Sequence, residues 1–249
     1  MPRRPRVEYV GYHHIINRGV ARNNIFLNEK DKDKFLEILL ETRELYHFIV
    51  HSFVLMDNHY HILIETKFEN LSMLTRHINS KYAQYFNKKY NRVGPLWQGR
   101  FKNWYVFDEK YLYILFRYIE QNPIKANITK DIGEYYYSAF SMILANEQSK
   151  LLQNSKLLDK EMFDILGKKL NDDEICLLDT FEKTKYKVDK KEIVRLKQKS
   201  LFEYFDIDLK DKKVRNRQIK KALKDGYKQS ECARHLGLSA GAVSQIAKK

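Results

Sequence analysis

Several short stretches of the chain are rich in β-branched, aromatic and other apolar residues, whereas in longer stretches apolar residues recur every three or four positions. The short apolar stretches are typical of β-strands, and the three-to-four repeat is that of an amphipathic helix. The short stretches predict strands over 12–19, 47–56, 58–65 and 100–107. The three-to-four repeat predicts helices over 28–46, 70–90 and 108–121, the last with Asp108 as its N-cap.

These elements follow the order strand, helix, strand, strand, helix, strand, and a further helix comes after them. That is the order of the ferredoxin-like split unit. It predicts an α+β fold in which an antiparallel sheet is covered by helices on one face. Asp57 and Asn58 separate the second strand from the third and are typical hairpin-turn residues, so these two strands should pair.

The chain changes in composition after the last of these helices. Residues 146–211 are rich in Lys and Asp and give only helical fragments, so we predict a charged, partly helical connector between a domain over 1–145 and a region over 212–249. That C-terminal region reads as helix, Gly-containing turn and helix, which predicts a helix-turn-helix. Its acidic residues are few, and its basic residues are Lys212, Lys213, Arg215, Arg217, Lys220, Lys221, Lys224, Lys228, Arg234, Lys248 and Lys249.

The chain of 249 residues carries a formal charge of +14 and is 43% hydrophobic and 13% aromatic. The apolar content excludes wholesale disorder, and the charge favours a polyanionic partner, either nucleic acid or a membrane surface. Only Cys176 and Cys232 occur, so neither a disulfide framework nor a thiolate zinc cluster is expected, as in a reducing compartment. No apolar stretch suits a signal peptide or a transmembrane helix, which predicts a soluble, cytoplasmic protein.

His59 and His61 lie in the third predicted strand, within the stretch FVLMDNHYHILIET. At a spacing of two they share one face of the strand, and Tyr60 lies on the other. Such a pair can be hydrogen-bonded in a core or stacked at a surface. It can also bind a metal, since two neutral imidazoles on one face converge on one ion, but the site then needs a third ligand from elsewhere.

The helix after the fourth strand offers further candidates in the sequence RYIEQNPIKANI. Tyr118 has Asn122 four positions ahead, so on a helix an amide lies beside the phenol. Ordinary helix packing would equally account for Tyr118. Pro123 disfavours helical geometry at the preceding residue, so the helix is expected to end at Asn122, which could instead cap the segment that follows.

Together, His-hydrophobic-His on a strand, PLWQGRF before the fourth strand and YIEQNP on the next helix resemble the single-tyrosine transposases of the HUH endonuclease superfamily. The likeness is greatest to the REP-associated tyrosine transposases. VEYVGYHHIINRGVARNNIF is similar to that family's first strand and Arg-Gly turn, and YYYSAFSMIL to its aromatic-Ser-Ser-aromatic stretch, so the likeness spans residues 6–140. Tyr60, where an apolar residue is usual, and Asn127, where Gly is common, depart from the pattern. Neither changes a ligand, and asparagine tolerates left-handed geometry.

The resemblance implies an HUH endonuclease core in which His59 and His61 hold the metal, Tyr118 is the nucleophile and Asn122 is the third ligand. It implies that Tyr118 attacks a phosphodiester of single-stranded DNA, giving a 5′-phosphotyrosine and a free 3′-OH that allow strand transfer. Nitrogen and oxygen ligands suit Mg²⁺ or Mn²⁺, although Zn²⁺ or Ni²⁺ could bind imidazoles more tightly. No general base is identifiable. The family further implies a bacterial, nucleoid-associated protein and allows for a homodimer.

The implied substrate is single-stranded DNA beside a short hairpin. Candidates for contacts to its backbone, each of which could instead be a solvated surface charge, are Arg3, Arg4, Arg6, Arg18, Arg100 and Lys102. Trp97 could stack on a base or fill the core. Residues 239–247 form the predicted recognition helix, in which Ser244 and Gln245 can reach base edges. The alternative is a helix-turn-helix that only docks on the main domain.

Three other functions compete with a transposase. A regulator that kept the fold would bind DNA without catalysis, but His59, His61 and Tyr118 are all present. A metallohydrolase for small molecules would need further acidic or histidine ligands and would leave the charge of +14 unexplained. Replication initiators and relaxases usually bring a helicase or a second tyrosine, and this chain has no phosphate-binding Gly-rich loop. We therefore expect an HUH-type transposase, with the catalytically silent regulator as the alternative.

Overall fold

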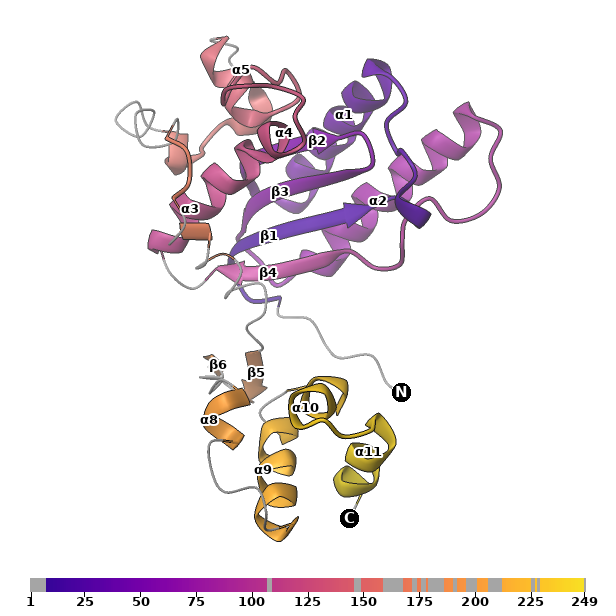
Figure 1. Cartoon of the computed structure of the whole chain (residues 1–249). Helices are drawn as coiled ribbons and strands as arrows, with labels where there is room; N and C mark the ends of the chain where they lie inside the picture. Colours follow the sequence, from indigo (N-terminus) through magenta and orange to yellow (C-terminus); the bar gives the residue numbers. More distant parts are fainter. Residues whose placement is uncertain are drawn as a thin grey trace. The chain divides into compact units, whose positions relative to one another are not determined.

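The computed structural model describes residues 8–106, 109–145, 149–158, 168–171, 174–175, 178, 186–189, 192–195, 201–205, 212–224, 227 and 229–248 (Figure 1). The chain divides into two compact units, Met1–Asp179 and Thr180–Lys249. The segment expected to be a connector is therefore shared between the two units. Asp108, the predicted helix N-cap, lies outside the described residues.

A four-stranded antiparallel sheet forms the centre of the first unit. Its strands are β1 (Gly11–Arg18), β2 (Ile49–Met56), β3 (His59–Thr66) and β4 (Lys102–Val106), in the spatial order β2-β3-β1-β4. Each neighbouring pair is antiparallel, which confirms the predicted ferredoxin-like sheet. In β2 every residue is buried, and in β3 only the residues near its ends are partly exposed, because helices cover both faces.

Helices lie on both faces of this sheet (Figure 1). On one face, Tyr60 of β3 packs against Phe35 of α1 (Glu29–Tyr46) and donates a hydrogen bond to Asn79 of α2 (Leu71–Lys89). On the other face, α3 (Glu109–Glu120) covers β2 and β3. Our expectation of helices on one face thus holds for α1 and α2 only. The additional helix α3 buries the opposite face of the sheet. Without it, the strand side chains on that face would be exposed to water.

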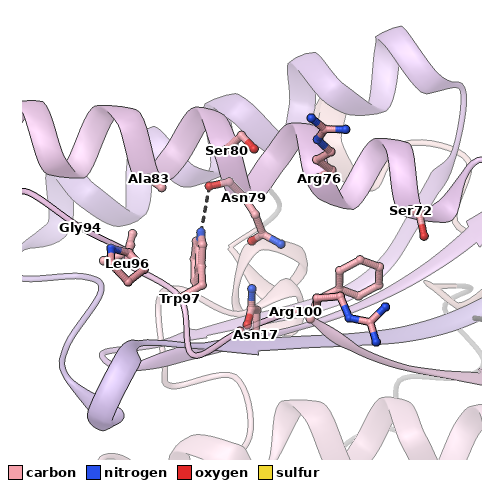
Figure 2. A pocket seen from close by; sticks show the side chains of 13 residues that line it. Asn17, Ser72, Arg76, Asn79, Ser80, Ala83, Gly94, Leu96, Trp97 and Arg100 are labelled. Atoms are coloured by element: carbon pink, nitrogen blue, oxygen red, sulfur yellow. Dashed lines mark hydrogen bonds between the residues drawn. The ribbon is translucent and has the colours of Figure 1, made fainter. Parts of the chain in front are cut away.

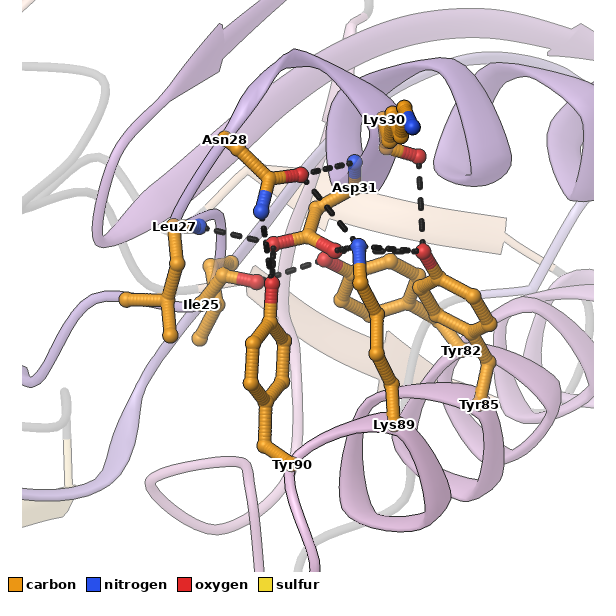
Figure 3. A network of polar contacts seen from close by, with 9 residues as sticks. All are labelled: Ile25, Leu27, Asn28, Lys30, Asp31, Tyr82, Tyr85, Lys89 and Tyr90. Carbon is orange, nitrogen blue, oxygen red and sulfur yellow. Dashed lines mark hydrogen bonds and ion pairs between the residues drawn. The ribbon is translucent and has the colours of Figure 1, made fainter.

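The ends of α1 and α2 are joined by a buried carboxylate (Figure 3). Asp31, which is 0% exposed, accepts hydrogen bonds from the backbone N–H of Leu27, the hydroxyls of Tyr85 and Tyr90 and the ammonium of Lys89. Burial by itself raises the pKa of this carboxyl, but the bonds from Lys89, Tyr90 and Leu27 outweigh burial and lower the pKa below its ordinary value. A buried charge with this many donors is compatible with a stable core.

The loop after β1 approaches the hairpin between β2 and β3 very closely. It contains the short 3₁₀ helix η1 (Val20–Arg22), and the N–H of Gly19 donates to the carbonyl of Asn58 at 2.9 Å. A Cβ atom at Gly19 would lie 2.1 Å from the carbonyl oxygen of Asn23, so only glycine fits this position. The loop is thereby held against the residue that precedes His59.

The other described helices of the first unit pack against the sheet and α3. They include α4 (Asn122–Lys125), α5 (Ala139–Leu144), η2 (Lys150–Leu152) and η3 (Lys156–Leu158). Arg117 of α3 forms an ion pair with Glu174 at 2.7 Å and donates to the backbone carbonyls of residues 168 and 169. Part of the expected connector therefore stabilises the helix that carries Tyr118.

The second unit is a small helical domain. Its core, which includes Ile219, Cys232 and Val243, joins α8 (Leu201–Phe205), α9 (Lys212–Lys224), α10 (Gln229–Leu236) and α11 (Ala240–Lys248). Gly237 has a φ of +62° in the turn between the last two helices, as a helix-turn-helix requires. The antiparallel pair β5 (Tyr186–Asp189) and β6 (Glu192–Arg195) was not predicted. Within the described parts of both units, no helix is long and apolar enough to cross a membrane.

Candidate active site

Three histidines gather on the face of the sheet that α3 covers. The register of β1 and β3 sets Arg18 opposite His59 and Ile16 opposite His61, so the side chains of these residues project from the same face. The ring centroids of His59 and His61 are 5.1 Å apart, and those of His61 and His14 are 5.2 Å apart. The predicted histidine pair is thus accompanied by a third imidazole that comes from β1.

Hydrogen bonds fix which nitrogen of each ligand candidate remains available. The Nδ1 of His59 lies 2.6 Å from the amide oxygen of Asn58, and since that oxygen only accepts, Nδ1 carries the proton. The Nδ1 of His61 is bonded to the Nε2 of His14 at 3.0 Å. In both rings the nitrogen left for a further partner is Nε2. A metal-binding imidazole held in this way by its other nitrogen is the usual arrangement in proteins.

All three imidazoles are held in the neutral form. Burial lowers the pKa of His14 to about 3, and burial together with the charge of Arg18 lowers that of His59 to about 4. The pKa of His61 is lowered well below its ordinary value by burial first and then by His14, His59, Lys125 and Arg18. Neutral rings keep a lone pair on one nitrogen at pH 7, as a metal ligand must.

Tyr118 lies over this histidine cluster. Its ring centroid is 6.0 Å from that of His61 and 6.4 Å from that of His14, with the rings nearly perpendicular. The ammonium of Lys125 lies 4.1 Å from the Tyr118 ring centroid, in a cation–π contact. Helix α3 and strand β3, which are far apart in sequence, therefore bring the predicted nucleophile and the predicted ligands together.

Asn122 closes the end of α3. Its side-chain N–H₂ group donates to the backbone carbonyls of Tyr118 and Ile119 at 2.9 and 3.1 Å, which ties the amide to the last turn of the helix. Its oxygen has no partner among the described residues. The helix ends at Glu120, two residues before the expected end at Asn122, and Asn122 instead begins the short helix α4, in which Pro123 is the second residue. Asn127, at the position where Gly is common, adopts a left-handed φ of 55°.

A basic pocket adjoins the histidines at the loop end of β1. It has a volume of about 330 Å³ and is lined by Ile16, Asn17, Arg18, Arg22, Gln98, Arg100 and Lys102. None of its four cations forms an ion pair with another described residue. Three of the six basic residues selected from the sequence thus lie together. The other three, Arg3, Arg4 and Arg6, lie outside the described residues.

The C-terminal candidates belong to the second unit. Ser244 and Gln245 lie on α11, where Gln245 is exposed and Ser244 is half-buried. Ser239 caps this helix by accepting a hydrogen bond from the N–H of Ala242. Trp97 is half-buried and its indole N–H donates to the backbone carbonyl of Asn79, so it is in part the core residue that one interpretation of the sequence expected.

Sequence reasoning missed three residues of the cluster, His14, Asn58 and Lys125. The signal for His14 was present, because the predicted first strand contains two consecutive histidines and one of them has to share a face with the other ligand candidates. Asn58 was assigned only a role in the turn. Lys125 sits four residues beyond the predicted end of the helix, and its contact with Tyr118 depends on the turn at α4.

Comparison with known proteins bears on residues 7–122, which match the family model described as Transposase IS200 like. This segment belongs to the IS200-like transposase family. The IS200-like domain contains His14, His59, His61, Tyr118 and, as its last matched residue, Asn122. The resemblance inferred from the motifs is thereby confirmed, and the function of the domain is that of a transposase.

Solved structures similar to this chain include two transposases. One, a REP-associated tyrosine transposase bound to a REP hairpin, is 17% identical, with a TM-score of 0.49 over 69% of this chain and 99% of that one. The other, from Deinococcus radiodurans R1 and provisionally described as a transposase, is 17% identical, with a TM-score of 0.35 over 49% of this chain and 97% of that one. A search of curated proteins gave no match. The family assignment of the IS200-like domain therefore depends on its sequence.

Proposed function

We propose that the IS200-like domain is a metal-dependent, single-stranded DNA endonuclease and strand transferase of the HUH type, with Tyr118 as its nucleophile. One observation carries this proposal. The Tyr118 ring lies 6.0 Å from His61, on the sheet face that also presents His59. If Tyr118 served only to pack α3, apolar side chains beneath it would suffice. Instead, two neutral imidazoles lie there, each with a ring nitrogen that has no hydrogen-bond partner among the described residues.

The residues present fit a divalent cation. His59 and His61 are neutral, and the Nε2 atom of each has no partner among the described residues. The amide oxygen of Asn122 likewise has no partner among those residues. His14 uses its Nε2 for the hydrogen bond to His61, and no three His, Cys, Asp or Glu side chains in the described part of the chain are placed to hold one metal, so a third protein ligand would have to be of another kind. Asn122 is our candidate, and this donor set suits Mg²⁺ or Mn²⁺. When bound, such an ion polarises the scissile phosphate and offsets its developing charge.

The chain's own residues supply the nucleophile and a positive charge beside it. The Tyr118 oxygen forms a bond to phosphorus while the bond from phosphorus to the 3′-oxygen breaks, so the 5′-phosphate becomes attached to the phenol. The phenol proton is lost, and the departing 3′-oxygen takes up a proton to leave a 3′-OH. Lys125, whose ammonium lies 4.1 Å from the ring centroid, offsets the negative charge that develops on the phenol oxygen. The phosphotyrosine conserves the energy of the broken bond, so a second DNA end can be joined without ATP.

The DNA strand reaches Tyr118 by way of the basic pocket. Arg18 lies opposite His59 in the paired strands, and Arg22, Arg100 and Lys102 extend the positive charge away from it. Four cations that form no ion pair with another described residue, gathered in one pocket, suit the phosphates of a single strand. We expect a short hairpin beside the cleavage site. We place the protein at the nucleoid of a bacterial cell and retain a homodimer as its assembly.

The second unit adds a duplex-binding surface to this proposal. Exposed basic residues of α9 include Lys212, Arg217, Lys220 and Lys221, and α11 presents Gln245. A short helix following a tight turn is the element that enters a major groove. Substituting both Lys220 and Lys221 by Gln should weaken binding to duplex DNA and reduce the salt dependence of that binding. The same variant should still cleave a single-stranded oligonucleotide through its first unit.

The decisive test is a covalent adduct. An oligonucleotide with a hairpin and single-stranded flanks, taken from the DNA around the gene and labelled at its 3′ end, is incubated with Mn²⁺ and the full chain. The wild type and Tyr113→Phe, a control on the same helix, should both give a labelled protein band that resists denaturation, and Tyr118→Phe should give none. Absence of adduct from every variant, with binding intact, would favour the catalytically silent regulator.

A further inference from the structure

A second cavity lies behind the basic pocket, on the opposite side of the sheet from Tyr118. It has a volume of about 550 Å³ and separates α2 from the loop before β4 (Figure 2). Asn17 of β1 lines it, and Asn17 points to the face opposite that of its neighbour Arg18 because strand side chains alternate. The cavity is therefore distinct from the histidine site.

Two buried amides present hydrogen-bond donors to this cavity. Asn17 is 5% exposed and Asn79 is 8% exposed. The oxygen of Asn17 accepts from the N–H of Arg18, and the oxygen of Asn79 accepts from the hydroxyl of Tyr60. Neither Nδ2 has a hydrogen-bond partner among the described residues, and Figure 2 shows both amide nitrogens directed into the space between β1 and α2. Both nitrogens are open to the cavity, so they can donate to water or to a ligand that displaces it.

The walls of the cavity are aromatic and apolar. Trp97 and Phe101 line it together with Leu96 and Ala83. The indole N–H of Trp97 donates to the backbone carbonyl of Asn79, which holds the ring in one orientation. A fixed aromatic wall beside unsatisfied donors suits a flat ligand that carries acceptors at its edge. A nucleobase has this shape and stacks on aromatic side chains with about 1–3 kcal/mol per base.

Positive charge at the mouth of the cavity indicates a polyanionic ligand. Arg76 of α2 and Arg100 are exposed there, and neither is ion-paired with a described residue. Arg100 and Asn17 line both this cavity and the basic pocket beside the histidines. The two hollows thus adjoin at the end of β1. A strand whose phosphates follow the basic pocket can turn one base into the cavity.

We propose that this cavity binds one unpaired, keto-bearing base of single-stranded DNA, thymine or guanine, with the adjoining phosphates held by Arg76 and Arg100. The amide nitrogens of Asn17 and Asn79 donate to the base carbonyl oxygens. Adenine has no carbonyl oxygen, and its amino donor finds no acceptor here because the oxygens of both amides are already bonded, so it binds more weakly. This base pocket rests on the proposed DNA-binding function, but it requires neither the metal nor the chemistry of Tyr118.

Binding is measured without divalent metal, so that cleavage plays no part. The chain has two tryptophans, and Trp104→Phe leaves Trp97 as the single fluorescent reporter. The probes are oligothymidylate, oligodeoxyadenylate and an abasic oligomer, each of about eight nucleotides. Oligothymidylate should quench Trp97 and bind several-fold more tightly than oligodeoxyadenylate. The abasic oligomer should bind through its phosphates without quenching, and equal quenching by all three would overturn the base pocket.

Variants then separate the base contact from the charge. Asn79→Leu and Asn17→Leu should each reduce the thymidylate preference about tenfold, as loss of a base-specific contact does. Arg76→Gln should weaken every oligomer, whereas Lys88→Gln, on the same helix outside the cavity, should not. Should the asparagine variants fail to fold, a 5-iododeoxyuridine oligomer cross-linked to the unaltered chain should label residues 94–101. Cross-links found only elsewhere would contradict the proposal, and absence of all oligonucleotide binding would instead overturn the proposed function.

Discussion

The two faces of the central sheet differ in how their polar groups are satisfied. Beneath α1 and α2, the carboxylate of Asp31 accepts four hydrogen bonds and the hydroxyl of Tyr60 donates to Asn79. Beneath α3, His59 and His61 keep unspent nitrogens, and the cations near Arg18 form no ion pair within the described chain. The polar groups around Asp31 and Tyr60 stabilise the fold, and the donors left open on that face are the amide nitrogens of Asn17 and Asn79 in the cavity beside α2. The face beneath α3 keeps its open nitrogens at the centre of the histidine cluster, where a ligand can use them.

A single strand serves both purposes because its side chains alternate. Tyr60 lies between His59 and His61 in sequence, yet it is 0% exposed and packs in the core on the other face. The departure from the family pattern at Tyr60 therefore affects packing and leaves the ligand candidates unchanged. Substitutions at successive positions of β3 should then have effects of different kinds.

The largest effect is expected for the histidines. His59→Ala or His61→Ala should reduce adduct formation on the order of 1,000-fold, since a bound cation contributes several kcal/mol to stabilising phosphoryl charge. Thermal unfolding should change little for the half-buried His59, whereas His61→Ala also removes the buried partner of His14, so activity is compared per folded molecule. Adduct yield against time, with Mn²⁺ titrated, measures the loss. Activity within tenfold of wild type would remove the metal role from these residues.

The buried carboxylate should show the reverse behaviour. Asp31→Asn should lower the free energy of unfolding by about 3 kcal/mol, because Lys89 loses a buried partner, and it should leave the activity per folded molecule unchanged. The control Glu41→Gln, which removes an exposed pair with Lys81, should cost less than about 1 kcal/mol. Denaturant titration gives both values, and similar losses for the two variants would contradict this assignment.

The pH dependence sharpens the Asp31 prediction. The folded-state pKa of Asp31 lies below its unfolded value, so its contribution to stability is present above about pH 4 and is lost as the pH falls through the folded pKa. The stability gap between wild type and Asp31→Asn should therefore shrink on acidification from pH 6. A gap that stays constant down to pH 2 would show that the charge is not the source of the stabilisation.

A smaller effect is expected at Tyr60. Tyr60→Phe removes the hydroxyl that donates to Asn79 at 2.9 Å and should cost about 1 kcal/mol of stability. Its adduct yield should equal that of wild type, in contrast to its two neighbours. Unfolding and adduct assays on the same preparation provide the comparison, and a Tyr60→Phe protein as inactive as His61→Ala would break the separation of the two faces.

The smallest effect concerns the basic pocket. Arg18→Gln should weaken single-strand binding several-fold and reduce the slope of log affinity against log salt by about 0.7, the value for one phosphate contact. Arg92→Gln, a cation outside the pocket, is the matched control. Anisotropy at several salt concentrations distinguishes them, and equal slopes for both variants would place the DNA elsewhere.

The sequence predicted whatever depends on local pattern. Short stretches of β-forming residues located the strands, and the spacing of two put His59 and His61 on one face. Pro123 located the end of the next helix to within two residues, whereas the role of Tyr118 came from the family resemblance carried in part by YIEQNP. Contacts that depend on long-range strand pairing could not be predicted from the sequence. His14 meets His61 across 47 residues through the register of β1 with β3, and no local period encodes that register. The face that α3 covers and the base pocket beneath α2 have the same origin in tertiary packing.

The most direct measurement is to digest the covalent DNA–protein product and identify the modified residue by mass spectrometry. We predict a single nucleotide adduct on Tyr118, dependent on Mn²⁺ and absent from His61→Ala. An adduct on another tyrosine, or an adduct on Tyr118 that forms equally well in His61→Ala, would contradict a nucleophile served by the histidine face.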